Sequence, residues 1–284
     1  MGPRAFAICA PEAHRRCICL VRRMEWRESD GVRWLEADLG GARAAFATRL
    51  GGVSAAPFDR LNLGVLTDDS NEAVVENRGR LAAALGLDPA RVPIGLQVHG
   101  AKLAFHAEPQ QPSPFAVPGS EIPSIDGHVV GEPGLAPLVF TADCLPVALS
   151  GPGGVAMLHC GWRGLAAGIA SAGAEAVGAT AAAIGPGIGP CCYEVGPEVL
   201  DAFSALGPGI TNPADGPKSR VEGGISAHRR LDLVEVARRL LLEAGVARVE
   251  AAGLCTSCEP ELFFSHRRDA GRTGRQGGLV WIEA

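Results

Sequence analysis

Three short segments of the chain carry the residue types that bind a catalytic metal ion. His99 follows the apolar residues 92–97, Cys144 follows residues 135–141, and His159 follows residues 155–158. Imidazole nitrogen and thiolate sulfur are common zinc ligands, and a catalytic zinc keeps three protein ligands and one open position. Because each residue ends an apolar run that is typical of a strand, the set predicts a metal-assisted enzyme.

Two charged neighbours strengthen this interpretation. Asp143 precedes Cys144 and can orient a ligand through a hydrogen bond or act as a general base. Arg163 lies four residues after His159 and suits an anionic group. Each ligand candidate has a structural alternative, since a buried cysteine often serves as a small hydrophobe. That alternative is favoured for Cys160, because it follows His159 on one strand and must point to the opposite face.

Other motifs compete less well. A four-cysteine structural zinc needs two spaced pairs, and Cys255–Cys258 is one, but Cys191 and Cys192 are adjacent, which argues against chelation by both. A thioredoxin-like redox motif would need a helix that begins at Cys255, and the sequence shows no clear helix start there. Residues 185–189 lack the spacing of a dinucleotide-binding loop and contain proline. Residues 265–269 hold Ser, His and Asp, but no nucleophile elbow supports a hydrolase.

Composition bounds the class of protein. The chain has 284 residues, a net charge of −5 and no basic cluster, so a nucleic-acid partner is not expected. Nine cysteines without regular disulfide spacing favour a reducing, cytoplasmic location. The sequence contains no run of about 18 apolar residues, so we expect no membrane span. We expect residues 1–26 to form a poorly ordered extension, or an upstream start ahead of Met24, and residues 27–284 to form a single catalytic domain.

Strand and helix patterns alternate without a regular βαβ rhythm, which favours an α+β fold with mixed sheets. We expect a surface loop at residues 109–123, which are rich in proline and glutamine, and a flexible loop at residues 207–224. Predicted strands cover residues 32–36, 44–48, 92–97, 135–141, 147–149, 155–158, 249–254 and 279–282. Predicted helices cover residues 71–85, with Asn71 as cap, and residues 164–183, 198–205 and 231–244.

Several motifs in a fixed order resemble the YfiH-type family, known as polyphenol oxidase or laccase-domain proteins. The resemblance runs from about Trp34 to the C-terminus. It rests on TRLGGVS at residues 48–54, LNLG at 61–64, QVHG at 97–100, TADCLP at 141–146, HCGWRG at 159–164, GPGI at 185–188, CCYEV at 191–195, LFFSHRRD at 262–269 and TGRQ at 273–276.

The resemblance implies one domain with mixed β-sheets sandwiched by helices, and zinc on His99, Cys144 and His159, with copper possible. It also implies a purine nucleoside phosphorylase that cleaves adenosine, inosine and methylthioadenosine with phosphate to ribose 1-phosphate and free base. Adenosine deamination is a further activity of the family. The partners would be these small molecules, and the protein a monomer or small homo-oligomer.

Roles for further residues follow from this chemistry. Arg49, Ser54 and the glycine turn between them suit a phosphate, and Arg163 is a second candidate. Asp143 or Glu194 would carry protons in deamination. Asn62, Gln97 and Cys192 complete the expected substrate-binding residues, together with Glu194.

Two other classes remain open at this point. A copper-dependent polyphenol oxidase needs many histidines around several coppers, and the chain has seven in all. A non-catalytic metal-binding protein would leave the arginines near the ligands unexplained.

Overall fold

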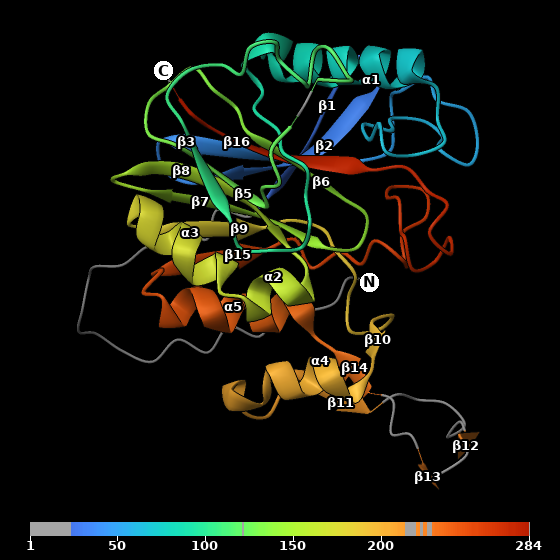
Figure 1. Ribbon diagram of the computed structural model, residues 1–284, viewed down its shortest axis with the longest axis vertical. Coiled ribbons are helices and arrows are strands. Elements are labelled where there is room, and N and C mark those ends of the chain that lie inside the picture. The colour runs from blue at the N-terminus through green and yellow to red at the C-terminus, as the bar shows by residue number, and fades with distance from the viewer. Residues whose placement is uncertain (1–23, 121, 214–219, 222–223, 226–228, 284) are drawn as a thin grey trace, which may run out of the picture.

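The computed structural model describes residues 24–120, 122–213, 220–221, 224–225 and 229–283. Two large β-sheets pack face to face, and helices cover both outer faces (Figure 1). This arrangement confirms the expected single domain of β-sheets sandwiched by helices, although only one of the two large sheets is mixed. In the described part of the chain no helix is long and apolar enough to cross a membrane.

The first large sheet is antiparallel, with strand order β1-β2-β3-β16-β6. Its strands are β1 (Glu25–Ser29), β2 (Val32–Asp38), β3 (Ala42–Ala47), β6 (Leu138–Thr141) and β16 (Gln276–Ile282). Helix α1 (Asn71–Leu85) covers its outer face. Ser70 caps this helix by accepting the backbone N–H of Ala73, so the cap lies one residue before the expected Asn71.

The second large sheet is mixed, with strand order β15-β9-β7-β8-β5-β4. Only its outermost pairs, β15 with β9 and β4 with β5, are parallel. Its strands are β4 (Leu103–His106), β5 (Gly127–Val130), β7 (Leu145–Gly151), β8 (Gly154–Cys160), β9 (Ala181–Ile184) and β15 (Arg248–Ala251). Phe46, Met157 and Val280 are fully buried in the core between the two sheets.

The outer face of the mixed sheet is covered by α2 (Trp162–Ala166), α3 (Ile169–Val177) and α5 (Leu233–Glu243). A small layer below them contains α4 (Pro197–Ala202), the 3₁₀ turn η2 (Ser204–Leu206), and strands β10 (Glu194–Val195), β11 (Thr211–Pro213) and β14 (Arg229–Leu231). The remaining elements are η1 (Pro89–Arg91) and the hairpin of β12 (Arg220–Val221) and β13 (Gly224–Ile225).

Three predicted elements differ from the structure. Residues 92–97 are not a named strand, because only Leu96 forms a bridge, with Ser124. The single helix expected at residues 164–183 is α2, α3 and β9, because Gly168 and Gly178 adopt positive φ and end helical segments. Residues 109–123 are not wholly superficial, since the Phe115 ring is buried.

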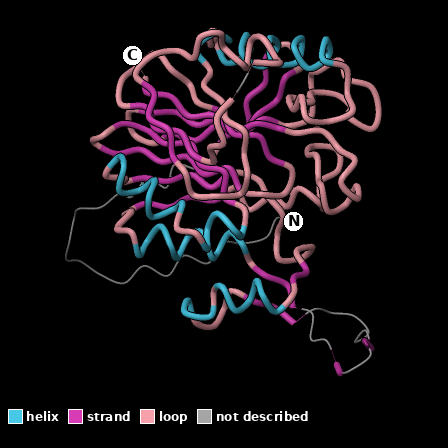
Figure 2. The backbone as a smooth tube through the Cα atoms, viewed as in Figure 1, coloured by secondary structure: helices cyan, strands magenta, loops and turns pink. Residues whose placement is uncertain are grey.

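The expected N-terminal boundary also shifts. Glu25 and Trp26 belong to β1 and pair with β2, so the folded domain begins before residue 27. Residues 1–23 lie outside the described part of the chain, as does much of the loop expected at 207–224. Long loops, drawn in pink in Figure 2, gather beside the ends of both large sheets.

Candidate metal centre and pocket

His99, Cys144 and His159 come from three separate segments and meet at one point. His159 is on β8, Cys144 immediately precedes β7, and His99 lies in the loop before β4. Their ligand atoms all lie within 4.8 Å of one another. The two imidazole rings meet edge to face with centroids 4.8 Å apart. The structure therefore brings together the three residues that the sequence indicated.

Two features of the backbone allow this convergence. His99 adopts φ 62°, a conformation that costs energy for a residue other than glycine and marks a constrained site. Gly161 lies between two ligands, and a Cβ there would come within 3.0 Å of both Cys144 Sγ and His99 Cδ2. Only glycine therefore fits at residue 161 without displacing the ligands.

Asp126 holds two of the three ligands, and its role was not foreseen from the sequence. Its Oδ1 accepts the backbone N–H of His99 at 2.8 Å and lies 2.9 Å from His159 Nδ1. Its Oδ2 accepts the backbone N–H groups of Val98 and Gly100 at 3.1 and 2.8 Å. A carboxylate on Nδ1 leaves Nε2 of His159 to face the metal position, as in carboxylate–histidine–zinc sites.

Electrostatics favour a thiolate at Cys144. Burial acts to raise the pKa of Cys144, but contacts with His159 and His99 outweigh it and lower the pKa to about 6. Burial acts to lower the pKa of His159, but Cys144 and Asp126 together raise it to about 9. These shifts favour a thiolate at Cys144 beside a protonated His159, and a metal ion would take the place of the imidazolium proton.

The donor set fits zinc. One sulfur and two nitrogens within 4.8 Å of one another can surround a single ion, and the carboxylate of Asp126 supplies the outer support that such sites use. Three protein ligands leave one coordination position for water or substrate, which is the pattern of a catalytic rather than a structural site.

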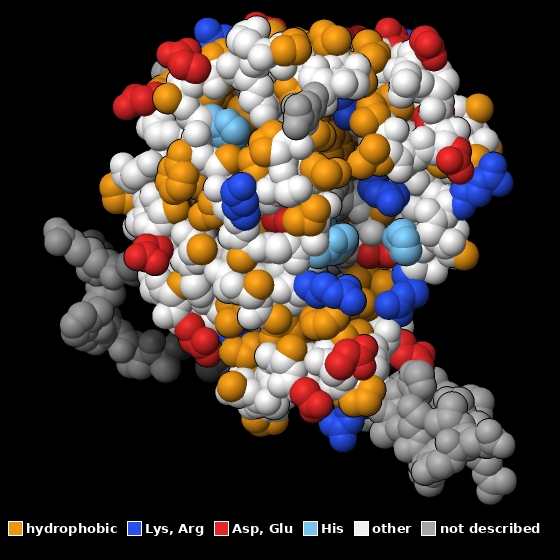
Figure 3. Space-filling view, in the orientation of Figure 1, with side chains coloured by type: hydrophobic (Ala, Val, Ile, Leu, Met, Phe, Trp, Pro, Cys, Tyr) orange, Lys and Arg blue, Asp and Glu red, His pale blue; other side chains and the backbone are white. Residues whose placement is uncertain are grey.

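The three ligands line a cavity of about 760 Å³, a size that accommodates a small organic ligand. Phe140, Trp162 and Tyr193 contribute aromatic surface to its lining. The proline-rich loop at residues 109–123 forms another part of the wall, since residues 118–120 and 122 line the cavity. Histidine and basic side chains surround the hollow on the face shown in Figure 3.

Four arginines line this cavity: Arg78, which is described below, and three others. Arg163 stacks over the Trp162 ring, with 4.5 Å from its guanidinium carbon to the ring centroid. Arg267 stacks over Tyr193 and donates to the Glu194 carbonyl at 2.8 Å. Burial lowers the pKa of the third, Arg275. Guanidinium groups in a partly apolar cavity are suited to binding a phosphate or another anion.

Two buried polar atoms in the lining have no hydrogen-bond partner among the described residues. They are Nη2 of Arg78 and Oγ1 of Thr141. The other donors of Arg78 are occupied by the carbonyls of Leu63, Pro114 and Phe115. Because leaving a buried donor unpaired is costly, these atoms are suited to meeting polar groups of a ligand.

Asp143 lies beside the metal ligands but is firmly held. Its carboxylate accepts the hydroxyl of Thr256 at 2.6 Å and the backbone N–H of Arg267 at 2.7 Å. It is buried in the cavity lining and adopts φ 95°. These contacts tie the segment of Cys144 to residues 256–267.

Arg49, expected to bind phosphate, lies outside the cavity lining. Its Nε donates to the Asp59 carbonyl at 2.6 Å, and its Nη1 donates to the Pro260 carbonyl at 3.0 Å. Its Nη2 forms an ion pair with the Asp59 carboxylate at 3.2 Å. The guanidinium thus joins two loops through all three of its nitrogen atoms, which favours a structural role for Arg49 over the expected phosphate role.

Ser54 and Asn62 likewise serve the structure of their loops. The Ser54 hydroxyl donates to Asp69 Oδ2 at 2.6 Å. Asn62 is fully buried, and its Nδ2 also donates to Asp69 at 2.9 Å. Neither residue lines the cavity, so the glycine turn and its neighbours hold this region together by internal hydrogen bonds.

The remaining expected substrate residues fall in different places. Gln97 lines the cavity and exchanges two hydrogen bonds of 2.7 Å with the backbone of Phe140. Glu194 is exposed on β10 and is not in the lining. Cys192 is also outside the lining and lies beside Cys258. Cys160 is fully buried on the opposite side of β8, which confirms its expected place in the core.

The chain is similar over most of its length to proteins of one family. A family model described as multi-copper polyphenol oxidoreductase laccase matches residues 43–283. The purine nucleoside phosphorylase YfiH of Escherichia coli (strain K12) is 38% identical over 253 residues, which cover 85% of this chain and 94% of that protein. The purine nucleoside phosphorylase YlmD of Geobacillus stearothermophilus is 38% identical over 252 residues, covering 84% and 90%.

Solved structures show the same fold. A crystal structure of YlmD from Geobacillus stearothermophilus matches with a TM-score of 0.77 and 35% identity, over 92% of this chain and 99% of that one. A crystal structure of YfiH from Bacillus licheniformis matches with a TM-score of 0.77 and 31% identity, over 91% and 99%. With most of its length matched in both sequence and structure, this chain belongs to the YfiH-type family of laccase-domain proteins.

Proposed function

We propose that the protein is a zinc-dependent purine nucleoside phosphorylase. It cleaves adenosine and inosine, and also methylthioadenosine, with phosphate to give ribose 1-phosphate and the free base. The observation that carries the proposal is the convergence of His99, Cys144 and His159 in a cavity that is lined by arginines and aromatic rings. The names of two relatives at 38% identity support it.

The metal ligands and their support have distinct tasks. His99, Cys144 and His159 would hold the ion, and Asp126 orients His159 and the backbone of residues 98–100. When bound, zinc supplies a Lewis acid and a water of lowered pKa, which suits the accompanying deamination of adenosine. Asp143 lines the cavity whereas Glu194 does not, so Asp143 would be the carboxylate that carries protons.

Phosphorolysis requires an anion beside C1′ of the ribose, since a phosphate oxygen forms a bond to this carbon while the bond to the purine nitrogen breaks. Arg163, Arg267 and Arg275 can provide this anion site from the cavity wall. A guanidinium makes paired, charge-assisted hydrogen bonds to phosphate oxygens, and these hold the nucleophile in position.

The purine finds both apolar and polar partners. Phe140, Trp162 and Tyr193 offer flat surfaces against which a base can stack. Arg78 Nη2 and Thr141 Oγ1 can meet ring nitrogens or the exocyclic group of the base. Their pairing with a base would satisfy two buried groups, so a purine would be preferred over an apolar ligand of the same shape.

The second candidate is a copper-dependent phenol oxidase, because a His₂Cys set also suits copper. Metal analysis of the purified protein, combined with assays of base release with and without phosphate and of phenol oxidation, separates the two. We expect zinc, phosphate-dependent release of hypoxanthine from inosine, and no phenol oxidation. Copper with phenol oxidation and no base release would overturn the proposal, and inactivity in every assay would indicate a non-catalytic metal-binding protein.

A further inference from the structure

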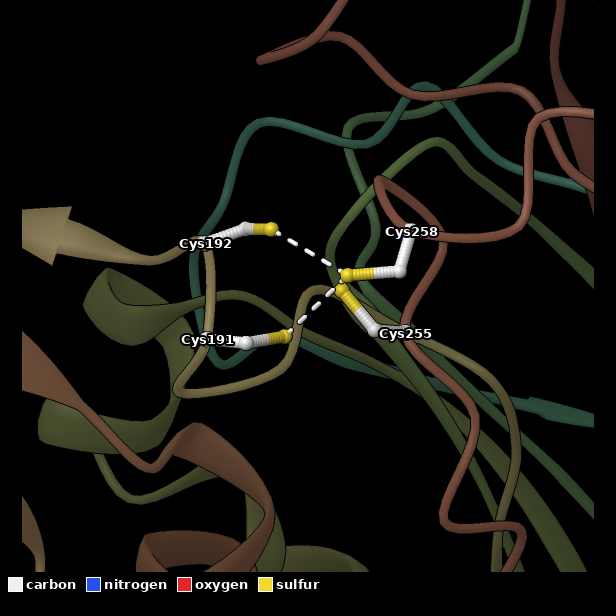
Figure 4. A group of neighbouring side chains, drawn as sticks. All are labelled: Cys191, Cys192, Cys255 and Cys258. Atoms are coloured by element: carbon white, nitrogen blue, oxygen red, sulfur yellow. Dashed lines mark hydrogen bonds between the residues drawn. The ribbon is translucent and has the colours of Figure 1, made fainter.

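A second group of metal-binding side chains lies outside the cavity. Cys191 and Cys192 are in the turn between β9 and β10, and Cys255 and Cys258 follow β15. Figure 4 shows their sulfur atoms pointing toward one another from these two segments. The four sulfurs all lie within 4.8 Å of one another, and all four cysteines are free thiols.

The spacing of these sulfurs suits one tetrahedral ion. Zinc–sulfur bonds of about 2.3 Å in a tetrahedron place the sulfurs about 3.8 Å apart. Cys258 Sγ lies 3.3 Å from Cys191 Sγ and 3.4 Å from Cys192 Sγ. A small outward movement of the sulfurs would therefore admit the ion. Sulfurs around a cluster of several irons lie farther apart, so the group fits a single metal.

The turn at residues 189–193 explains why adjacent cysteines can both take part, contrary to the sequence-based expectation. The backbone N–H groups of Cys192 and Tyr193 both donate to the Gly189 carbonyl at 3.0 Å, which curls the chain tightly. The Gly189 N–H itself donates to Cys255 Sγ at 3.2 Å. A backbone N–H group that donates to sulfur stabilises the thiolate form, which is the form that binds a metal ion.

One of these segments lines the cavity through Ile188 and Tyr193, and the other is hydrogen-bonded to a residue of the lining. Gly187 and Cys255 form a parallel bridge, and the Thr256 N–H donates to the Gly187 carbonyl at 3.0 Å. Thr256 also donates its hydroxyl to Asp143, the residue before Cys144. Tyr193, which follows Cys192, lines the cavity. A link between the two segments therefore helps to fix Tyr193 and Asp143, two residues of the cavity lining.

We propose that Cys191, Cys192, Cys255 and Cys258 bind a structural zinc ion that joins the two segments and holds this part of the cavity lining in place. Four thiolates fill the coordination sphere, so this ion has no open position and takes no part in the chemistry. Its binding free energy instead stabilises the fold around the cavity.

Zinc content per chain tests the proposal. We expect two zinc ions in the native protein and one in Cys144→Ala, with X-ray absorption showing only sulfur ligands at about 2.3 Å in that variant. Cys258→Ser should retain one zinc with mixed nitrogen and sulfur ligands, unfold at a lower temperature and show a raised KM for nucleoside. The matched control Cys160→Ala removes a buried core thiol and should retain both ions.

The three cysteines before Met24 need their own control, since they lie outside the described residues. Replacing Cys9, Cys17 and Cys19 together by serine should leave two zinc ions per chain. Loss of all zinc from the Cys144→Ala protein would overturn the proposal, whether or not the three N-terminal cysteines are also replaced. So would iron in place of zinc, or a disulfide between Cys258 and Cys191 or Cys192 in freshly purified protein.

These outcomes are independent of the proposed activity. A Cys144→Ala protein that keeps one all-sulfur zinc supports the structural site whatever the enzyme's substrate. Conversely, a native protein with one zinc and full phosphorolysis would contradict the second site and leave the proposed function standing.

Discussion

Replacing Asp126 by asparagine isolates the support of the metal centre while preserving the shape of the side chain. Each carboxylate oxygen accepts two hydrogen bonds: Oδ1 from the His99 backbone and the His159 ring, and Oδ2 from the Val98 and Gly100 backbones. An asparagine can keep only one of these oxygens. Its NH₂ group must face either the N–H groups of Val98 and Gly100, or the N–H group of His99 and the His159 ring, which can accept only in its other tautomer.

The size of the effect follows from this count. At least one buried backbone donor is left unsatisfied, so the free energy of unfolding of the metal-free protein should fall by at least about 1–3 kcal/mol. Loss of the charge beside His159 should also weaken zinc binding and activity by about 10–100-fold, the usual effect of losing such outer support.

Denaturant unfolding of chelator-treated protein measures the first effect, and competition with a chromogenic chelator measures the second. Asp232→Asn is a matched control, because Asp232 caps α5 through one backbone N–H and asparagine caps equally well. If Asp126→Asn kept the zinc affinity, stability and activity of the native protein, Asp126 would not support the metal centre in this way.

Three further predictions concern the thiolate, a buried arginine and the anion site. In chelator-treated protein, alkylation of Cys144 should rise with pH around a midpoint near 6, because the thiolate forms above its lowered pKa. His159→Gln should move this midpoint upward, and peptide mass spectrometry measures both midpoints. An unchanged midpoint would show that the imidazolium is not the cause of the lowered pKa. Arg78→Ala should lower the free energy of unfolding by about 3 kcal/mol or more, because three buried carbonyls lose their donor; a change below about 1 kcal/mol in denaturant unfolding would contradict this. Arg163→Ala should raise the KM for phosphate about tenfold or more, while Arg49→Ala should reduce thermal stability and leave that KM near the native value; steady-state kinetics at varied phosphate tests the pair, and the opposite pattern would return the anion to Arg49.

The convergence of the three candidate metal ligands could be predicted because the signals around them are local. His159 and Cys144 adjoin apolar strands, and helix α1 carries its own end signals at Ser70 and Gly86. Such patterns depend on a few neighbouring residues, so tertiary contacts with distant segments do not change them. The structure of the alanine-rich residues after Gly164 was harder to predict. Composition alone favours one helix there, but Gly168 and Gly178 adopt positive φ and interrupt it.

The partners of charged and polar side chains could not be predicted from local pattern. Asp126 binds backbone groups 26–28 residues earlier in the chain, and only the tertiary fold brings them together. Arg49 has the type and the glycine neighbours that suit phosphate, but folding places the Asp59 carboxylate and the Pro260 carbonyl at its donors. The cysteine pairs meet because Gly187 and Cys255 lie side by side, a pairing between distant segments.

The central claim is that zinc at His99, Cys144 and His159 enables phosphorolysis of a purine nucleoside. Phosphorus NMR of the reaction with inosine and phosphate tests it most directly. We predict that ribose 1-phosphate appears in step with hypoxanthine for the zinc-loaded protein, is absent after removal of the metal, and returns on adding zinc. Formation of free ribose without ribose 1-phosphate, or an equal rate in the metal-free protein, would contradict the account.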